Sequence, residues 1–227
     1  MLVIPVPAWV AATNSYILAA DRGGMAIVVD APPEPEPIAA ELIKHDLTIA
    51  ALLLTHGHID HTGGAGALSK GPGASVYVHP DDDFLTLHPE RQLRAMFGMI
   101  PPGEYTLPER FEALQDRQLL ELGGFTVEVR QTPGHTPGHC CFYLQDRGVL
   151  FSGDQLFAGS VGRTDLAGGS WDDLMTSMRD RVMTLGDEVR VLPGHGPETT
   201  IGRERSMNPF RAEWEADPQG SVPDSSR

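Results

Sequence analysis

The sequence predicts one domain in which two β-sheets are covered by helices. Strand and helix patterns are mixed through both halves of the chain, which favours helix-covered sheets over a single sheet with helices gathered at one end. The chain has 227 residues, enough to bury a sizeable hydrophobic core. No repeat, low-complexity tract or linker divides it. We therefore expect an α+β fold in a single domain over residues 1–208.

The first part of the chain predicts three strands, a helix and a buried strand. Short apolar runs separated by turn residues predict the three strands, over residues 1–6, 14–20 and 25–30. A proline-rich connector then opens a helix over residues 37–46. The run IAALLLT at residues 49–55 is apolar without interruption, which is typical of a strand buried on both faces.

The rest of the chain predicts six more strands and two helices. The strands are expected over residues 74–79, 117–123, 125–132, 140–145, 148–153 and 188–194. A helix is predicted over 170–186, with Ser170 as its N-cap and Asp173 at the capping-box offset, and another over 199–208. Residues after Pro209 carry no apolar period, so we expect a loosely ordered tail over 209–227.

Charge and the N-terminal segment exclude some classes of partner. The formal net charge is −14 and we find no basic patch, which argues against nucleic acid as a partner. The first 20 residues lack a basic leader and are interrupted by Pro5, Pro7 and Asn14. This pattern argues against a signal peptide and a membrane span, so we expect a cytoplasmic protein that does not bind membranes.

The only cysteines, Cys140 and Cys141, are adjacent, which rules out a disulfide framework. On a strand their side chains point to opposite faces of the sheet, so we expect at least one to be buried. We favour a structural role over a reactive thiol.

The segment Thr55–His61, THGHIDH, gathers four candidate metal ligands where a buried strand gives way to a loop. In an extended segment His56 and His58 point the same way and can converge on one ion. Asp60 and His61 follow where the chain turns towards a helix, and they can face a second ion. Histidine nitrogen and carboxylate oxygen suit zinc, iron or manganese.

Four ligands cannot complete two coordination shells, so further ligands must come from elsewhere in the chain. Three candidates lie at strand ends beside glycine, namely His135, Asp154 and His195. Glycine beside a ligand allows the backbone to approach the ion closely. The Asp154 carboxylate can bridge two cations held roughly 3.5–4 Å apart.

These motifs, in this order, resemble those of the metallo-β-lactamase superfamily. The segments GRTDLAGGS and PGHGPETTIGRERSMNPF resemble more narrowly the short bacterial glyoxalase II-like proteins, or hydroxyacylglutathione hydrolases. The similarity runs from the first strands to about Pro209. It implies an αββα sandwich of two mixed sheets, with two divalent metals, expected to be zinc but with iron or manganese also suitable, at one edge. It assigns the first metal to His56, His58 and His135, the second to Asp60, His61 and His195, and the bridge to Asp154.

The metal site predicts a metallohydrolase. Two cations that share a water lower its pKa and make a hydroxide nucleophile, and a thiolate leaves easily because its pKa is near 8.5. We therefore predict hydrolysis of a 2-hydroxyacyl thioester, S-lactoylglutathione or a related small-thiol thioester. The resemblance suggests that Asp60 orients the water. Arg163 is expected either to hold a substrate carboxylate or to order its loop.

Other activities remain open at this stage. Persulfide dioxygenases with a single iron also carry a segment like Gly162–Asp165, and lactonases or β-lactamases share the metal site. Full-length glyoxalase II enzymes have an additional C-terminal helical domain that contacts glutathione. Only 18 residues follow Pro209. We therefore expect weak selectivity for the thiol carrier and make no prediction of the oligomeric state.

Four histidines lie outside the set of candidate metal ligands. His139 is expected to make supporting contacts and not to bind metal. His79 is expected to end a strand before a solvated acidic turn, and His45 and His88 to lie on the surface. Two interpretations stay open for Met96, Phe97, Met99 and Ile100, which either line the substrate mouth or belong to the core.

Overall fold

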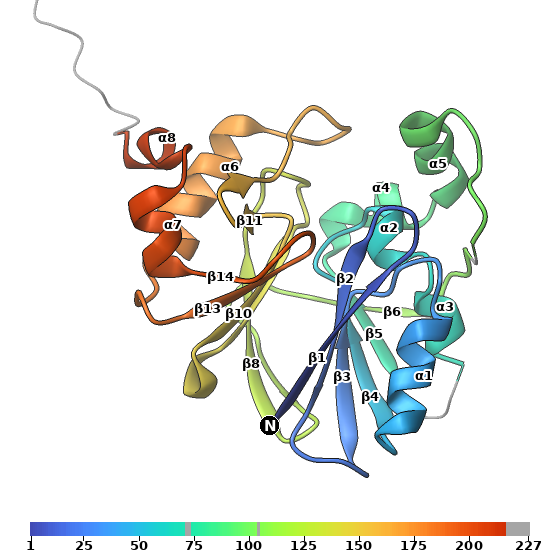
Figure 1. Cartoon of the computed structure of the whole chain (residues 1–227). Coiled ribbons are helices and arrows are strands. Elements are labelled where there is room, and N and C mark those ends of the chain that lie inside the picture. The colour runs from blue at the N-terminus through green and yellow to red at the C-terminus, as the bar shows by residue number, and fades with distance from the viewer. Residues whose placement is uncertain (71–73, 104, 217–227) are drawn as a thin grey trace, which may run out of the picture.

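Two six-stranded β-sheets pack face to face in the computed structural model, which describes residues 1–70, 74–103 and 105–216, with only the backbone of residues 96 and 97 (Figure 1). The first sheet has the order β1-β2-β3-β4-β5-β6. Its strands are β1 (Leu2–Ala8), β2 (Thr13–Ala19), β3 (Met25–Val29), β4 (Thr48–Leu53), β5 (Ser75–Val78) and β6 (Phe111–Ala113). Strands β1 to β3 pair antiparallel and β3 to β6 pair parallel, so the sheet is mixed.

The second sheet has the order β14-β13-β10-β9-β8-β7. Its strands are β7 (Leu119–Leu122), β8 (Phe125–Gln131), β9 (Cys140–Leu144), β10 (Val149–Gly153), β13 (Arg190–Pro193) and β14 (Thr199–Thr200). Only the β10–β13 pair is parallel among these neighbours. A short hairpin of β11 (Leu156–Phe157) and β12 (Ser160–Val161) follows β10.

Helices cover the outer face of each sheet (Figure 1). The first sheet carries α1 (Glu36–Lys44) and α3 (Ala65–Leu68). The second carries α6 (Trp171–Ser177), a π-helical turn η3 (Met178–Val182), α7 (Ile201–Met207) and α8 (Arg211–Glu215). The expected αββα sandwich is therefore confirmed. The other short helices are α2 (Ile59–Thr62), η1 (Pro80–Asp82), α4 (Asp83–Thr86), α5 (Pro89–Phe97) and η2 (Gln145–Arg147).

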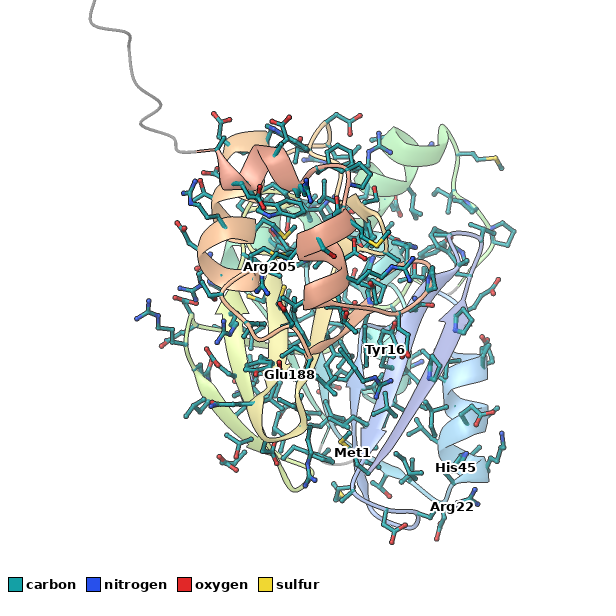
Figure 2. All side chains as sticks on the ribbon, turned by 60° about the vertical axis from the view of Figure 1, so that its left-hand side comes forward. Met1, Tyr16, Arg22, His45, Glu188 and Arg205 are labelled. Atoms are coloured by element: carbon teal, nitrogen blue, oxygen red, sulfur yellow. The ribbon has the colours of Figure 1, made fainter. Side chains whose placement is uncertain are left out.

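The hydrophobic core lies in three layers. The central layer joins the inner faces of the two sheets, with Leu18 and Ile27 from one and Val127 and Phe142 from the other. The other two layers lie between each sheet and its own helices. Tyr16 of β2 lies in the central layer (Figure 2). Its hydroxyl donates a hydrogen bond of 2.9 Å to the Pro193 carbonyl in β13, which joins the two sheets directly.

The adjacent cysteines face different layers, as the strand pattern predicts. Cys140 packs in the central layer and Cys141 in the layer beneath α6 to α8. Both are fully buried. Burial raises the pKa of the Cys141 thiol to about 12 and that of Cys140 well above its ordinary value. Buried thiols with raised pKa values react poorly, so this environment favours a structural role for both cysteines.

The predicted helix over residues 170–186 is divided into α6 and the π-helical turn. The Ser170 hydroxyl accepts a hydrogen bond from the Asp173 amide at 3.3 Å, which confirms the N-cap. The reciprocal half of the capping box is absent, because the Ser170 amide donates to the Gly134 carbonyl. Ser170 thus joins the helix to the loop that carries His135.

The expected loose tail does not begin at residue 209. Residues Arg211–Glu215 form α8, and Trp214 is only 2% exposed because it packs against α6 and η3. One aromatic side chain anchors this helix, so no apolar period was available to predict it. Residues 217–227 of the expected tail lie outside the described residues. No helix of the described ranges is both long and apolar enough to cross a membrane.

Candidate metal centre

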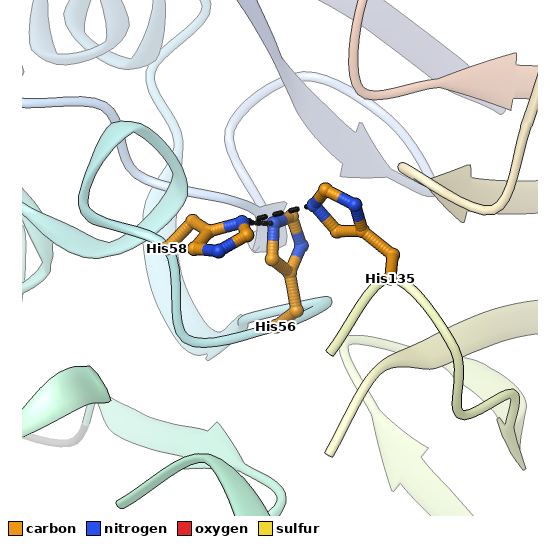
Figure 3. A group of neighbouring side chains, drawn as sticks. All are labelled: His56, His58 and His135. Carbon is orange, nitrogen blue, oxygen red and sulfur yellow. Dashed lines mark hydrogen bonds between the residues drawn. The ribbon is translucent and has the colours of Figure 1, made fainter. Parts of the chain in front are cut away.

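Three buried histidines from two distant loops converge at one edge of the sandwich. His56 and His58 follow β4, and His135 follows β8. His56 Nε2 lies 3.0 Å from His58 Nδ1, which in turn lies 2.9 Å from His135 Nε2 (Figure 3). The structure therefore brings together the three residues expected to hold a first metal, and we call them the first group.

A second group contains a carboxylate and two histidines. Helix α2 carries Asp60 and His61 next to each other, and the loop after β13 brings His195. The Asp60 Oδ2 atom lies 3.4 Å from His61 Nε2 and 3.3 Å from His195 Nε2. The ligand atoms of this group, like those of the first, all lie within 4.8 Å of one another. The three residues expected around a second metal are thus also adjacent.

Asp154 lies between the two groups, at the end of β10. Its Oδ2 atom is 3.6 Å from His135 Nε2 in the first group and 3.6 Å from His195 Nε2 in the second. Its Oδ1 atom is 3.4 Å from His61 Nε2. One carboxylate therefore reaches both groups, which is the geometry expected of a bridging ligand.

The chemistry of the cluster fits divalent cations. Among the described residues, His61 Nε2 and Asp154 Oδ1 are buried without a hydrogen-bond partner. A buried polar atom left in that state costs roughly 1–3 kcal/mol. Imidazole nitrogens and carboxylate oxygens are the ligands that zinc, iron and manganese accept in proteins. A bound cation would satisfy both of the unpartnered atoms.

The two groups differ in charge. Burial lowers the pKa of His58 to about 3 and that of His135 to about 4, so the first group offers neutral imidazoles. Burial alone would also lower the pKa of His61, but Asp60, Asp30 and Asp154 outweigh it and raise that pKa to about 10. Burial alone would raise the pKa of Asp60, yet His61 lowers it below its ordinary value. The carboxylates around the second group therefore favour a positive charge there, carried by a proton on His61 or by a bound cation.

Asp30, which directly follows β3, orients His61 of the second group. Its carboxylate lies 2.8 Å from His61 Nδ1, which leaves Nε2 to face the other ligands. The same carboxylate accepts hydrogen bonds from the amide and hydroxyl of Thr55, and the Thr55 hydroxyl lies 3.0 Å from His56 Nδ1. Sequence reasoning missed Asp30, although it follows an apolar strand in the same way as the predicted ligands do.

His139 and Thr13 support the two acidic residues of the cluster, Asp154 through its backbone amide and Asp60 through its carboxylate. His139 Nε2 accepts a hydrogen bond of 3.1 Å from the Asp154 amide, and its Nδ1 lies 2.8 Å from the Thr132 hydroxyl. The expectation that His139 makes supporting contacts is confirmed. The Thr13 hydroxyl donates to Asp60 Oδ2 at 2.9 Å, a contact that no local motif signals.

Arg163 contacts the first group through its backbone. His135 Nδ1 lies 2.7 Å from the Arg163 carbonyl oxygen, so the ring donates there and presents Nε2 to the cluster. The Arg163 guanidinium instead donates two hydrogen bonds to Asp165, at 2.6 and 2.7 Å. Of the two expected roles, this geometry supports ordering of the GRTD loop over binding of a substrate carboxylate.

A cavity of about 390 Å³ opens over the cluster. His58, Asp60, His135, Asp154 and His195 reach it. Its other wall is mainly apolar and comprises Ala11, Phe157, Val161 and Leu166, with Arg163 at the rim. Among the described residues that line this cavity, Arg163 is the one lysine or arginine, and it is paired with Asp165.

Two of the remaining predictions need correction. His79 directly follows β5 and begins the acidic turn, as expected, but His79 itself and Asp82 of the turn are buried, whereas Asp81 and Asp83 are exposed. His45 is half-buried beside Glu41, whereas His88 is exposed as expected.

The apolar segment before residue 101 is resolved in part. Met99 is 61% and Ile100 39% exposed, so the core interpretation is wrong for these two. Neither belongs to the lining of the cavity over the cluster. The side chains of Met96 and Phe97 lie outside the described part of the chain.

Comparisons with known proteins agree with this geometry. A family model described as the metallo-beta-lactamase superfamily matches residues 8–195. The hydroxyacylglutathione hydrolase GloC of Haemophilus influenzae is 36% identical over 208 residues, covering 92% of this chain and 96% of that protein. The BLEG-1 B3 metallo-beta-lactamase structure is similar with a TM-score of 0.82 and 35% identity, over 92% of this chain and 99% of that one.

A third relative bears on the metal. The structure of TTHA1623 in a di-iron-bound form is 37% identical with a TM-score of 0.81, over 91% of this chain and 99% of that one. The family model spans both groups of candidate ligands, from β1 to His195. By sequence, fold and the composition of its buried cluster, the chain belongs to the metallo-beta-lactamase superfamily.

Proposed function

We propose that this protein hydrolyses thioesters of small 2-hydroxy acids, S-lactoylglutathione or the thioester of a related small thiol, with two divalent metal ions. The observation that carries the proposal is that Asp154 joins two complete groups of ligands beneath a partly apolar cavity. The similarity to the hydroxyacylglutathione hydrolase of H. influenzae supports the substrate class. Zinc is the metal we propose, and the di-iron relative makes iron the principal competitor.

Each ligand has a defined place in this proposal. The first group would hold one cation, the second group the other, and Asp154 both. When bound, the cations supply Lewis acidity that polarises a carbonyl and lowers the pKa of water. The assignment leaves the two unpartnered buried atoms, on His61 and Asp154, directed at a cation.

The protein side of the reaction needs few further groups. Asp60 is ionised because its pKa is lowered, and its Oδ2 atom is fixed by the Thr13 hydroxyl. It can therefore accept a hydrogen bond from a water and orient it towards the substrate carbonyl. A thiolate needs no strong acid to leave, since free thiols have a pKa near 8.5. The apolar wall of Phe157, Val161 and Leu166 would exclude bulk water from the acyl group.

Other reactions of the superfamily would use the same ligands. The similarity to BLEG-1 makes β-lactam hydrolysis the best-supported alternative, and lactone hydrolysis and iron-dependent persulfide oxidation are further ones. We expect thioesters to be cleaved fastest in a screen of thioesters, lactones and β-lactams, with metal content measured on the same preparation. Oxygen uptake with a persulfide, in place of thioester cleavage, would overturn the proposal.

The same screen tests the thiol carrier. Arg163 is paired with Asp165, so the described lining offers no unpaired arginine or lysine to the carboxylates of glutathione. We expect lactoyl thioesters of glutathione and of a smaller thiol to differ by less than about tenfold in kcat/KM. A preference above roughly a hundredfold, about 2.7 kcal/mol in transition-state binding, would require a recognition surface beyond this cavity.

A further inference from the structure

We propose that Asp82 is a positioning residue that clamps together the two loops carrying the first group of metal ligands. Asp82 lies at the end of η1, just after β5, and is fully buried. Its carboxylate accepts hydrogen bonds from residues beside the ligands in the sequence. The inference rests on the metal site of the proposed function but not on any particular substrate.

The Asp82 carboxylate accepts three short hydrogen bonds from the two loops. Oδ2 accepts from the Gly57 amide at 2.7 Å and from the Thr136 hydroxyl at 2.7 Å. Oδ1 accepts from the Gly138 amide at 2.7 Å. Gly57 stands between His56 and His58, and Thr136 directly follows His135. One side chain thus holds a residue that is adjacent in sequence to each member of the first group.

Gly57 and Gly138 both pack directly against the Asp82 side chain. A Cβ atom at Gly57 would lie 2.8 Å from Asp82 Cβ, and one at Gly138 would lie 2.7 Å from Asp82 Cγ. Neither distance occurs in real contacts, so a side chain at either position would displace the clamp. The backbone approaches Asp82 as closely as glycine permits.

The clamp joins the two sheets. Gly57 follows β4 of the first sheet, whereas Gly138 precedes β9 of the second. Because His58 and His135 come from these different sheets, small movements of one sheet over the other would separate their nitrogens. Gln92 of α5 adds a second attachment on one side, since its amide donates to the Gly57 carbonyl at 2.9 Å and accepts from the Ile59 amide at 3.1 Å.

Burying a carboxylate at this position costs free energy that an apolar side chain of similar size would not. Burial raises the pKa of Asp82, and the hydrogen bonds from Thr136, Gly138 and Gly57 act in the opposite direction. A fully buried carboxylate is destabilising unless its hydrogen bonds compensate. Supporting partners of metal ligands typically change metal affinity by about 10–100-fold when removed.

The test measures metal affinity in each group separately. His195→Ala should leave the first group as the tighter site, and His58→Ala should leave the second. Asp82→Asn keeps the shape of the side chain but turns an NH₂ group towards one of the three donors. We expect Asp82→Asn to weaken zinc binding at least about tenfold in the His195→Ala background and by less than about threefold in the His58→Ala background. A competing chromophoric zinc chelator gives both values.

Two controls separate positioning from general destabilisation. Glu204→Gln alters another buried carboxylate with three hydrogen bonds, to Thr199, Gly159 and Asn208. It should lower the melting temperature of the metal-free protein without selective loss of first-group zinc. If Asp82→Asn does not fold, Thr136→Val removes one hydrogen bond of the clamp and should shift first-group affinity in the same direction by a smaller factor.

Equal weakening of both groups, or unchanged zinc affinity with a lower melting temperature, would overturn the proposal, as would a wild-type protein that binds no zinc. A protein that binds two zinc ions but cleaves no thioester would refute the proposed function and leave the role of Asp82 standing.

Discussion

The two groups of candidate metal ligands differ in charge and in access to solvent. The first group consists of three buried histidines, and the pKa values of His58 and His135 are lowered. Hydrogen bonds to Asp82 and to the Arg163 carbonyl hold the loops of this group in place. The second contains a carboxylate and includes His195, whose side chain is 30% exposed. Neutral ligands fixed by hydrogen bonds favour a tightly held cation, whereas the more exposed His195 gives the second group one ligand that solvent reaches. The fold thus gives the two groups different charge and different exposure within one cluster.

Removing the residue common to both groups should have the largest effect. Asp154→Ala withdraws a ligand from each and leaves two cations facing each other without a screening carboxylate. We expect kcat/KM to fall at least about a thousandfold, roughly 4 kcal/mol, and both metals to be lost on dialysis. Elemental analysis and kinetics measure this, with the exposed Asp172→Ala as control. Two retained metals and normal turnover would show that Asp154 does not bridge.

Removing a ligand of one group should distinguish the two groups. His195→Ala affects only the second group, so we expect one metal to remain and kcat to fall by about a hundredfold. His58→Ala should instead release the first metal and, because the more tightly held cation is lost, lower the melting temperature of the loaded protein further than His195→Ala does. Metal content and calorimetry on the two variants make the comparison. Equal metal loss in both would mean that the groups are not independent.

The pH dependence of metal binding should differ between the groups. His58 and His135, with pKa values of about 3 and 4, carry no proton at neutral pH, whereas His61, with a pKa of about 10, does. A cation entering the second group must displace that proton. We therefore expect second-group affinity to rise up to about tenfold per pH unit between about pH 6.5 and 8, and first-group affinity to stay nearly constant. Chelator competition at the two pH values measures both slopes; equal slopes would contradict the charge difference.

The same pKa shifts predict the acid stability of the metal-free protein. The pKa values of His58 and His135 are lowered on folding, so the unfolded chain binds protons that the folded chain excludes. Their contribution to stability is present above about pH 6.5 and is lost as pH falls towards about 4. His61 has the opposite sign: its raised pKa stabilises the fold below about pH 6.5, and that contribution is lost as pH rises through about 10.

The smallest effect is expected at Arg163. Its carbonyl serves His135 whatever the side chain, and its guanidinium is already paired with Asp165. Arg163→Ala should therefore change kcat and KM by less than about threefold. Gly162→Ala should be far more damaging, because a Cβ there would lie 1.9 Å from the Asp154 carbonyl oxygen. A large rise in KM for Arg163→Ala with kcat unchanged would restore the substrate-binding role.

Sequence patterns were sufficient for the fold class and for bringing the seven candidate ligands together. The ligands could be predicted because their signals are local in the sequence. These signals are the i, i+2 spacing of His56 and His58 and the glycines beside His135, Asp154 and His195. The supporting groups leave no such signal. Asp82 is one of three consecutive aspartates, and only the tertiary fold decides that it is buried while its neighbours are exposed. Trp214 likewise acquires its role from the helices it meets.

The burial of the adjacent cysteines has a consequence for the product of the proposed reaction. Disulfide exchange requires an accessible thiolate, and Cys140 and Cys141 are the only two cysteines in the chain. Both are enclosed, in different core layers, and both thiols have raised pKa values. In the proposed reaction, the disulfide form of the released thiol would therefore find no accessible cysteine with which to exchange. The cysteines of this protein would thus stay unmodified even where the proposed product is oxidised to its disulfide.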